Sequence, residues 1–329
     1  MNRKKSTRAA SLGALLLVLL VLPLFVTQPY LIHILIMIGI NVLLATSLRF
    51  IATSGQLSLA HAGMMSVGAY TSALLVMKGG LSVWIAMPLA GIAAMILAVL
   101  VGFPFVRLKG IYFTMVTLFL SEFIRLIAQQ WKGLTGGPSG ILDIPRPGAI
   151  AIPGLFNVDF ASKADYYYFI LILVLVCLLL LYALESSRIG MTLSSVRQSD
   201  SLAESLGMDA AGFRVLAFGI GGFFAGVSGA FYVHYLSAAN PDSFGFLLST
   251  YVLMYMVVGG MRRFSGPIIG AVILTIVPEV AGGLREYEPF VFAAILLLII
   301  FFLRDGVVSL PERIRRAKKE AATRLESKA

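Results

Sequence analysis

The 329-residue chain has little charge and almost no cysteine. Charged residues make up 13% of it, whereas about 25% is usual for a soluble domain. Hydrophobic residues make up 59%, and the mean hydropathy is +0.92, which excludes a soluble globular domain. The one cysteine, Cys177, lies in an apolar run and excludes an internal disulfide. The composition therefore predicts an all-α polytopic membrane protein.

The motifs of several kinds of active site are also missing. No stretch reads GxxxxGK[ST], so we expect no site for nucleotide phosphates in this chain. No GxSxG motif is present. His33, His61 and His234 lie in three separate apolar segments without the spacing of metal ligands. We therefore expect no catalytic residue, no metal site and no cofactor of its own, and an integral membrane enzyme is disfavoured.

Ten apolar segments are present, and most approach the length of about 20 residues that a bilayer requires. The third is rich in glycine and serine and the eighth is short, a pattern tolerated where a segment is buried in protein or lines a water path. We expect a basic N-terminus over residues 1–8, a transmembrane domain over 9–303 and a basic tail over 304–329. The ten predicted spans cover residues 9–26, 30–50, 57–77, 82–105, 110–128, 165–184, 213–235, 248–261, 265–283 and 288–303.

The formal charge of +10 acts as a topology signal. With the N-terminus inside, 20 of the 26 lysines and arginines fall on the inner side, five fall outside, and Arg125 lies within a span. This bias predicts that both termini are cytoplasmic. It also places the loop 129–164 outside and the loop 185–212 inside. Because the basic residues cluster at the ends of spans, we expect no nucleic-acid partner.

The inner loop 185–212 is a polar island that contains a short amphipathic run over residues 201–206. Leu202, Leu206 and Met208 are spaced to share one helical face, and Gly207 is a helix-stop residue. A helix this short is marginal alone and needs a partner surface. Two interpretations stay open: docking on another protein, or a solvated connector that contains one helical turn.

Polar residues inside the membrane are the candidates for a translocation path. Glu122 and Arg125 are three residues apart, so they can pair on one helical face, either along a path or as a structural ion pair. Residues 55–63 form the most polar start of any span, and a helix N-terminus capped by Ser54 explains only part of it. The small residues there leave room for a polar solute, and glycines elsewhere favour tight packing. The candidates for path or packing are Gly55, Gln56, Ser58, His61, Glu122, Arg125, Gly259 and Gly260.

Six stretches, in this order, carry a resemblance to a known family. The chain resembles the membrane permeases of ABC importers for branched-chain amino acids, of the LivM type. Each stretch alone is a weak signal, but the combination covers the third to the ninth span. The stretches are SGQLSLAHAGMMSVGAY (54–70), RLKGIYFTMVTL (107–118), LTGGPSGI (134–141), SRIGMTLSSVRQSDSLAESLGMD (187–209), SGAFYVHYLSAANPDSF (228–244) and VVGGMRRFSGPIIGA (257–271).

The resemblance implies a type II-like permease with an inverted pseudo-repeat, in the inner membrane of a bacterium. It implies four kinds of partner: a homologous second permease, two cytoplasmic ATPases that bind ATP and Mg²⁺, a periplasmic or lipid-anchored substrate-binding protein, and the bilayer. It also implies that the inner loop carries a coupling helix that docks on the ATPase. The resemblance carries this role over to Asp200, Ser201, Ala203, Glu204, Ser205, Gly207 and Met208. Ala203, Glu204 and Gly207 match the family's Ala-Glu-x-x-Gly pattern, whereas Asp200 stands where the family often has Glu.

Alternatives to a branched-chain substrate stay open, because related permeases carry urea, short amides or aromatic amino acids. An ion-coupled secondary transporter is an alternative of a different class. It predicts several carboxylates within the membrane, whereas the spans contain Glu122, with an arginine three residues away, and Glu279 near the end of a span.

Overall fold

The computed structural model describes residues 28–152, 156–158, 160 and 162–280. It also describes short pieces at 13–14, 16–23, 25, 290, 294, 297–298, 301 and 306–310. The predicted N-terminus 1–8 and most of the tail 304–329 lie outside the described residues. Only parts of the first and tenth predicted spans lie within them.

Six helices of the described chain are long and apolar enough to cross a membrane. They fall on six of the predicted spans because long apolar runs are stable as helices in lipid, where each backbone polar group must be satisfied internally. The six long helices are α2 (Pro29–Ala52), α4 (Val83–Phe105), α5 (Ile111–Gln130), α7 (Lys163–Ser186), α10 (Ala210–Leu236) and the run Pro241–Gly259, which joins η2 (Pro241–Phe244) to α11 (Phe246–Gly259). Two shorter helices, α3 (His61–Met77) and α12 (Ser265–Val280), fall on two further predicted spans.

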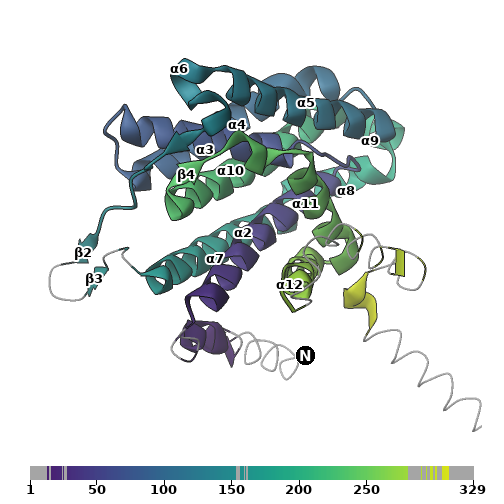
Figure 1. Ribbon diagram of the computed structural model, residues 1–329. Helices are drawn as coiled ribbons and strands as arrows, with labels where there is room; N and C mark the ends of the chain where they lie inside the picture. Colours follow the sequence, from purple (N-terminus) through teal and green to yellow (C-terminus); the bar gives the residue numbers. More distant parts are fainter. Residues whose placement is uncertain are drawn as a thin grey trace, which may run out of the picture.

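Helix α10 is the centre of the bundle and packs on α4, α3 and α2 (Figure 1). Small residues allow these helices to approach closely. A Cβ at Gly229 would overlap the backbone of Met65 on α3, and a Cβ at Gly68 would overlap the backbone of Gly226 on α10. The predicted packing role of the membrane glycines is therefore fulfilled along α10.

Helix α2 connects this centre to the rest of the bundle, because it packs on α7, α10 and α12 (Figure 1). Helices α11 and α12 cross at glycines: a Cβ at Gly259 would overlap the backbone of Gly266. Gly260 ends α11 with φ +109°, a conformation that favours glycine. Gly259 and Gly260, two candidates for path or packing, therefore serve close packing in this structure.

The predicted outer loop 129–164 contains short helices and strands, which its many glycines and prolines gave no reason to predict. They are α6 (Lys132–Thr135), η1 (Gly137–Ser139), β1 (Ile141–Leu142), β2 (Ile150–Ile152) and β3 (Phe156–Val158). Strands β2 and β3 pair with each other, and β1 pairs antiparallel with β4 (Ala238–Ala239), with Ile141 opposite Ala239. The β1–β4 pair fastens this loop to the end of α10.

The predicted inner loop 185–212 also folds further than expected. It forms α8 (Arg188–Gln198) and α9 (Asp200–Ser205). Outside this loop, a short 3₁₀ helix, η4 (Val307–Ser309), lies near the C-terminal end of the described residues. Ser187 caps α8 by accepting from the N–H of Ile189, and Ser199 caps α9 by accepting from the N–H of Leu202. The sequence pattern predicted α9 and missed α8.

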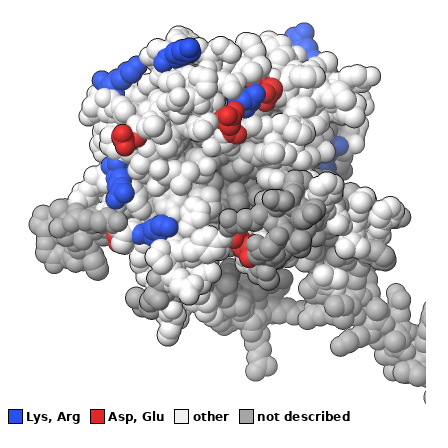
Figure 2. Space-filling view, in the orientation of Figure 1, with Lys and Arg blue, Asp and Glu red and all other residues white. Residues whose placement is uncertain are grey.

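The surface is poor in charge. Figure 2 shows a few scattered charged side chains on a largely uncharged face. Large apolar side chains are exposed on the outward faces of the bundle, among them Leu100 on α4, Phe119 on α5 and Leu179 on α7. Such faces suit lipid or neighbouring transmembrane helices.

Candidate functional site

Helix α9 is held in place by one carboxylate. Asp200 lies 2.8 Å from the Nζ of Lys109, in the turn between α4 and α5, and it accepts a hydrogen bond from Arg214 at the start of α10. Ala203, on the same helix, is buried against Val196 and Ala210. These contacts fix α9 against three other parts of the chain.

The ionisation of Asp200 follows from the same contacts. Burial opposes the charged form, but the hydrogen bonds from Lys109 and Arg214 outweigh it and hold the pKa of Asp200 below its ordinary value. The carboxylate is therefore ionised at neutral pH. It positions α9 from within the chain, so its side chain faces Lys109 and Arg214 instead of an incoming partner.

The opposite side of α9 is open to solvent. Leu202 and Leu206 are 62% and 69% exposed, and Ser201, Glu204 and Ser205 are exposed beside them. The expectation that Met208 shares the face of Leu202 and Leu206 is wrong, because Met208 packs back on the Val196–Ala203–Ala210 cluster. Gly207, with φ +79°, and the hydrogen bond from the N–H of Met208 to the carbonyl of Ala203 turn the chain there.

Between α2 and α3 the backbone is irregular over residues 55–60, which we call the broken segment. The predicted span 57–77 therefore becomes helical only at His61. Ser54 does not cap α3, since its hydroxyl donates to the carbonyl of Ile51 at 2.7 Å. The residue before α3 is Ala60, which has no side chain able to cap.

A ladder of hydroxyls on α5 satisfies the backbone of the broken segment and the start of α3. Thr114 donates to the carbonyl of Leu57 at 2.8 Å. Thr117 accepts from the N–H of Leu59 at 3.0 Å, and Ser121 accepts from the N–H of Gly63 at 2.8 Å. These three hydroxyls share one helical face of α5. None of the three hydroxyls was among the predicted site residues, although their helical spacing in a span beside a polar one was a usable signal.

Three predicted path residues in and beside the broken segment, Gln56, Ser58 and His61, are buried. Gln56 donates to the carbonyls of Val106 and Leu108 at 3.0 and 3.2 Å, and the Nε2 of His61 lies 3.0 Å from the hydroxyl of Ser47. Ser58 accepts from the N–H of Ala60 at 3.1 Å. Within the described chain, Gln56 Oε1 and His61 Nδ1 have no partner. In this conformation these side chains hold the broken segment inside the bundle.

Gly55 links the broken segment to the inner loop. It has φ +86°, and a Cβ there would lie 3.4 Å from the Cα of Arg197 on α8. Helix α8 therefore packs directly on the turn that begins the broken segment. The structure brings Gly55 and the α8–α9 loop together, which no sequence pattern indicated.

The predicted Glu122–Arg125 pair is present and has a third member. Arg125 Nη2 donates to Glu122 Oε1 at 2.5 Å, and its Nη1 donates to Asp242 Oδ1 at 2.8 Å. The side chain of Arg125 is 18% exposed, whereas those of Glu122 and Asp242 are 37% and 65% exposed. The guanidinium is thus covered by two carboxylates that remain open to solvent.

A family model described as "Branched-chain amino acid transport system / permease component" matches residues 30–302. The chain belongs to this family. Two curated relatives, each named "High-affinity branched-chain amino acid transport system permease protein LivM", are similar to it. The protein of Escherichia coli K12 is 29% identical over 308 residues, which cover 88% of this chain and 71% of the relative. The protein of Salmonella typhimurium LT2 is 29% identical over 296 residues, which cover 85% and 68%. No solved structure matches.

This permease has an ion pair that sequence reasoning missed. Arg49, at the end of α2, binds both carboxylate oxygens of Glu185 at 2.5 and 2.8 Å and donates to the carbonyl of Met261 at 2.9 Å. Its side chain is 5% exposed, and its guanidinium lies over the ring of Phe264. Arg49 thus joins α2 to the end of α7, where the predicted inner loop begins, and to the turn after α11.

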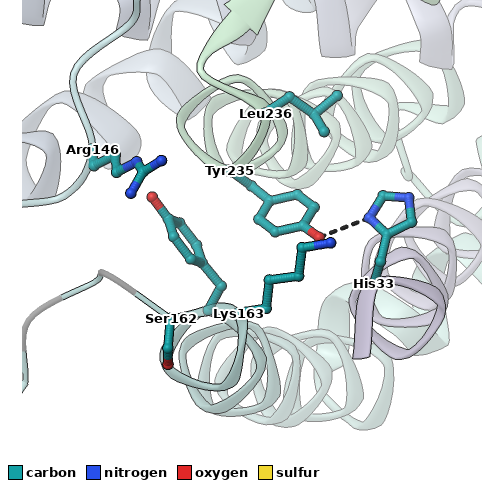
Figure 3. A pocket seen from close by; sticks show the side chains of 7 residues that line it. His33, Arg146, Ser162, Lys163, Tyr235 and Leu236 are labelled. Carbon is teal, nitrogen blue, oxygen red and sulfur yellow. Dashed lines mark hydrogen bonds between the residues drawn. The ribbon is translucent and has the colours of Figure 1, made fainter. Parts of the chain in front are cut away.

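On the predicted outer side, this permease has a cavity of about 410 Å³ between the ends of α2, α7 and α10. Figure 3 shows Arg146 at one side of it and Lys163 extending toward Tyr235, whose hydroxyl bonds to His33. The hydroxyl of Tyr235 lies 2.7 Å from His33 Nδ1. The lining contains two basic side chains and no acidic one among the described residues. This cavity therefore favours anionic groups.

Proposed function

We propose that this permease is a membrane-spanning subunit of an ATP-driven importer that carries branched-chain amino acids across the bacterial inner membrane. Family membership supports transport, and the names of the two relatives support the substrate class. ATP and Mg²⁺ are bound by two partner ATPases in this proposal. The chain itself has no nucleotide-binding motif of the GxxxxGK[ST] type.

The exposed side of α9 is the observation that carries the ATP-driven mechanism. A six-residue helix is unstable alone, yet this one is anchored from behind through Ala203 and Asp200. Its other side presents Leu202 and Leu206 to solvent from a polar loop. Exposed leucines on an anchored helix suit docking into a groove of another protein. We infer that α9 is the coupling helix and that its docking residues are Ser201, Leu202, Glu204, Ser205 and Leu206.

Motion can pass from α9 to the middle of the bundle through α8. When the partner ATPases close on ATP, they push α9, and the adjoining α8 contacts Gly55 at the start of the broken segment. The broken segment lacks the regular hydrogen-bond pattern of a helix, so a rigid-body shift of α8 can change its position. The bundle would then alternate between outward-open and inward-open states.

The wider assembly is also part of the proposal. It consists of this chain, a homologous second permease, the two ATPases and a periplasmic or lipid-anchored binding protein. The chain has ten spans with both termini cytoplasmic, residues 129–164 outside and 185–212 inside, and an inverted pseudo-repeat. The charge bias of the loops supports this topology. The transmembrane domain covers 9–303, between the N-terminus 1–8 and the tail 304–329.

Reconstitution into proteoliposomes with both ATPases, the second permease and the binding protein tests the proposal. We expect leucine uptake that requires ATP. Uptake by this chain alone, driven by an ion gradient, would show a secondary transporter instead. Uptake of urea, a short amide or an aromatic amino acid in preference to leucine would assign one of the alternative substrates.

Glu204→Lys tests the coupling helix separately. Reversing the charge on the exposed side of α9 should weaken association with the ATPase by about tenfold, since it reverses one partner of a charged contact. Ser194→Lys places a lysine on the exposed side of α8 and serves as the control for an added positive side chain, although it changes the net charge by one unit and Glu204→Lys by two. Unchanged co-purification of the ATPase with the Glu204→Lys chain would show that α9 is not the contact.

A further inference from the structure

A second cavity, of about 490 Å³, lies between α5, η2 and the start of α11. Its size is within the range of about 300–1,000 Å³ that is usual for small-molecule sites. One part of its wall is charged and consists of Glu122, Arg125 and Asp242. Another part is apolar and includes Phe246, Leu247 and Leu248. The cavity is therefore amphiphilic.

The charged wall carries one negative charge in excess, because two carboxylates share one guanidinium. Arg125 binds one oxygen of each carboxylate, at 2.5 Å for Glu122 Oε1 and 2.8 Å for Asp242 Oδ1. Arg125 uses Glu122 Oε1 and Asp242 Oδ1, and its hydrogen bonds leave Glu122 Oε2 and Asp242 Oδ2 to face other ligands. Carboxylate oxygens attract an ammonium group and form charge-assisted hydrogen bonds with it.

The apolar side chains of the cavity are also exposed to solvent. Phe246 and Leu247 are 49% and 57% exposed, although they stand beside charged side chains. Gly245 precedes them and also lines the cavity, and no side chain caps the helix that begins there. Its first N–H groups, together with the remaining N–H groups of Arg125, are donors for a carboxylate. A ligand with an ammonium, a carboxylate and an apolar group would match the carboxylates, the N–H donors and the apolar side chains of this cavity.

We propose that this cavity binds the transported amino acid as a zwitterion. The ammonium group binds Glu122 and Asp242, the carboxylate binds Arg125 and the start of α11, and the branched side chain packs on Phe246, Leu247 and Leu248. The proposal rests on the proposed function and extends it, since it names a substrate-binding site in this subunit. Asp242 and the start of α11 lie on the predicted outer side, so the site receives the amino acid before it crosses.

Protection of an introduced cysteine tests the site. Ser243 lines the cavity and is exposed, and Cys177 is the single native cysteine. In a Cys177→Ser, Ser243→Cys chain, assembled with its second permease and ATPases in nanodiscs without binding protein, labelling by a maleimide is followed with and without leucine. Leucine at ten times its dissociation constant should slow the labelling about tenfold. The matched control is Ser82→Cys, an exposed position at the start of α4.

The contributions of the charged and the apolar parts of the cavity can be measured separately by the same labelling assay. We expect no protection by 4-methylpentanoate, which lacks the ammonium, or by glycine, which lacks the apolar side chain. Glu122→Gln in the labelled chain should weaken leucine protection about tenfold or more. Leu247 is exposed, so Leu247→Ala removes no core contact. This second variant should weaken protection by leucine severalfold.

The outcomes separate this site from the proposed function. Labelling of Ser243→Cys that leucine does not slow, in a transporter that takes up leucine, would overturn the site alone. Equal slowing at Ser82→Cys, or equal protection by glycine, would also overturn it. Protection of Ser243→Cys in a complex that never takes up leucine would support the site and contradict the proposed transport.

Discussion

Replacing Asp200 by asparagine should loosen α9 without unfolding the bundle. The substitution keeps the size of the side chain but removes the charge that Lys109 and Arg214 share. A buried ion pair costs about 3–5 kcal/mol to break, and an exposed one about 0.2–1 kcal/mol. The Arg214 and Asp200 side chains are 11% and 19% exposed, between these limits, so we expect a loss of about 2 kcal/mol. That loss corresponds to a roughly 30-fold larger population in which α9 is detached.

Hydrogen exchange followed by mass spectrometry measures this population directly. The amides of residues 200–206 should exchange about 30-fold faster in Asp200→Asn, because they exchange through local opening, while those of α10 stay unchanged. Lys109→Gln is the control: the Lys109 side chain is 72% exposed, so its loss should change exchange by no more than about fivefold. Unaltered exchange at 200–206 in Asp200→Asn, or an equal effect of Lys109→Gln, would refute the reasoning.

Acid gives an independent check on the same contact. Because the pKa of Asp200 is lowered in the folded chain, its stabilisation is complete above the ordinary aspartate value of about 3.9 and is lost as the pH falls through the lowered value. After correction for intrinsic exchange rates, α9 should therefore be equally protected at pH 7 and pH 5. Protection that declines between these two values would contradict the assignment.

Three further substitutions and one control test the packing of the bundle through thermal unfolding in detergent. Gly229→Ala should cost about 3 kcal/mol or more, because its Cβ would overlap the Met65 backbone. Gly133→Ala, which has open space around it, should leave the melting temperature unchanged. Arg49→Lys should cost about 2–3 kcal/mol, since lysine cannot bind both oxygens of a carboxylate in the same geometry. Thr117→Val should cost about 1–3 kcal/mol by leaving an N–H of the broken segment unsatisfied.

Each of these has a contrary outcome. Equal melting temperatures for the two glycine variants would show that α10 and α3 can move apart freely. An Arg49→Lys chain as stable as the wild type would show that the guanidinium contributes no more than a point charge. A Thr117→Val chain with wild-type stability would mean that another group, or water, replaces the hydroxyl.

The sequence predicted the long helices closely because each depends on a local property. An apolar run such as α7 needs about 20 residues to cross lipid, and its own backbone bonds suffice to hold it. The end of α9 at Gly207 was predictable for a similar reason, since a left-handed residue there favours glycine. The Glu122–Arg125 pair was predictable from its spacing alone.

The rest depended on residues far apart in the chain. Arg49 and Glu185 are separated by 136 positions, and Arg125 and Asp242 by 117. Nothing local indicates that they meet, so the sequence placed Arg49 as a topology signal and left Asp242 unnoticed. The start of α3 was misplaced because the hydroxyls that hold the broken segment come from α5, which the hydropathy pattern describes only as apolar.

The hydroxyl ladder on α5 has a consequence for how the bundle changes shape. A hydroxyl rotates and can donate or accept, so it can exchange one backbone partner for the next without losing its bond. Each step risks a single hydrogen bond, about 1 kcal/mol, whereas unwinding a helical turn would break several at once. The polypeptide between α2 and α3 is therefore held to α5 by single, exchangeable hydrogen bonds instead of by the continuous bonding of a helix.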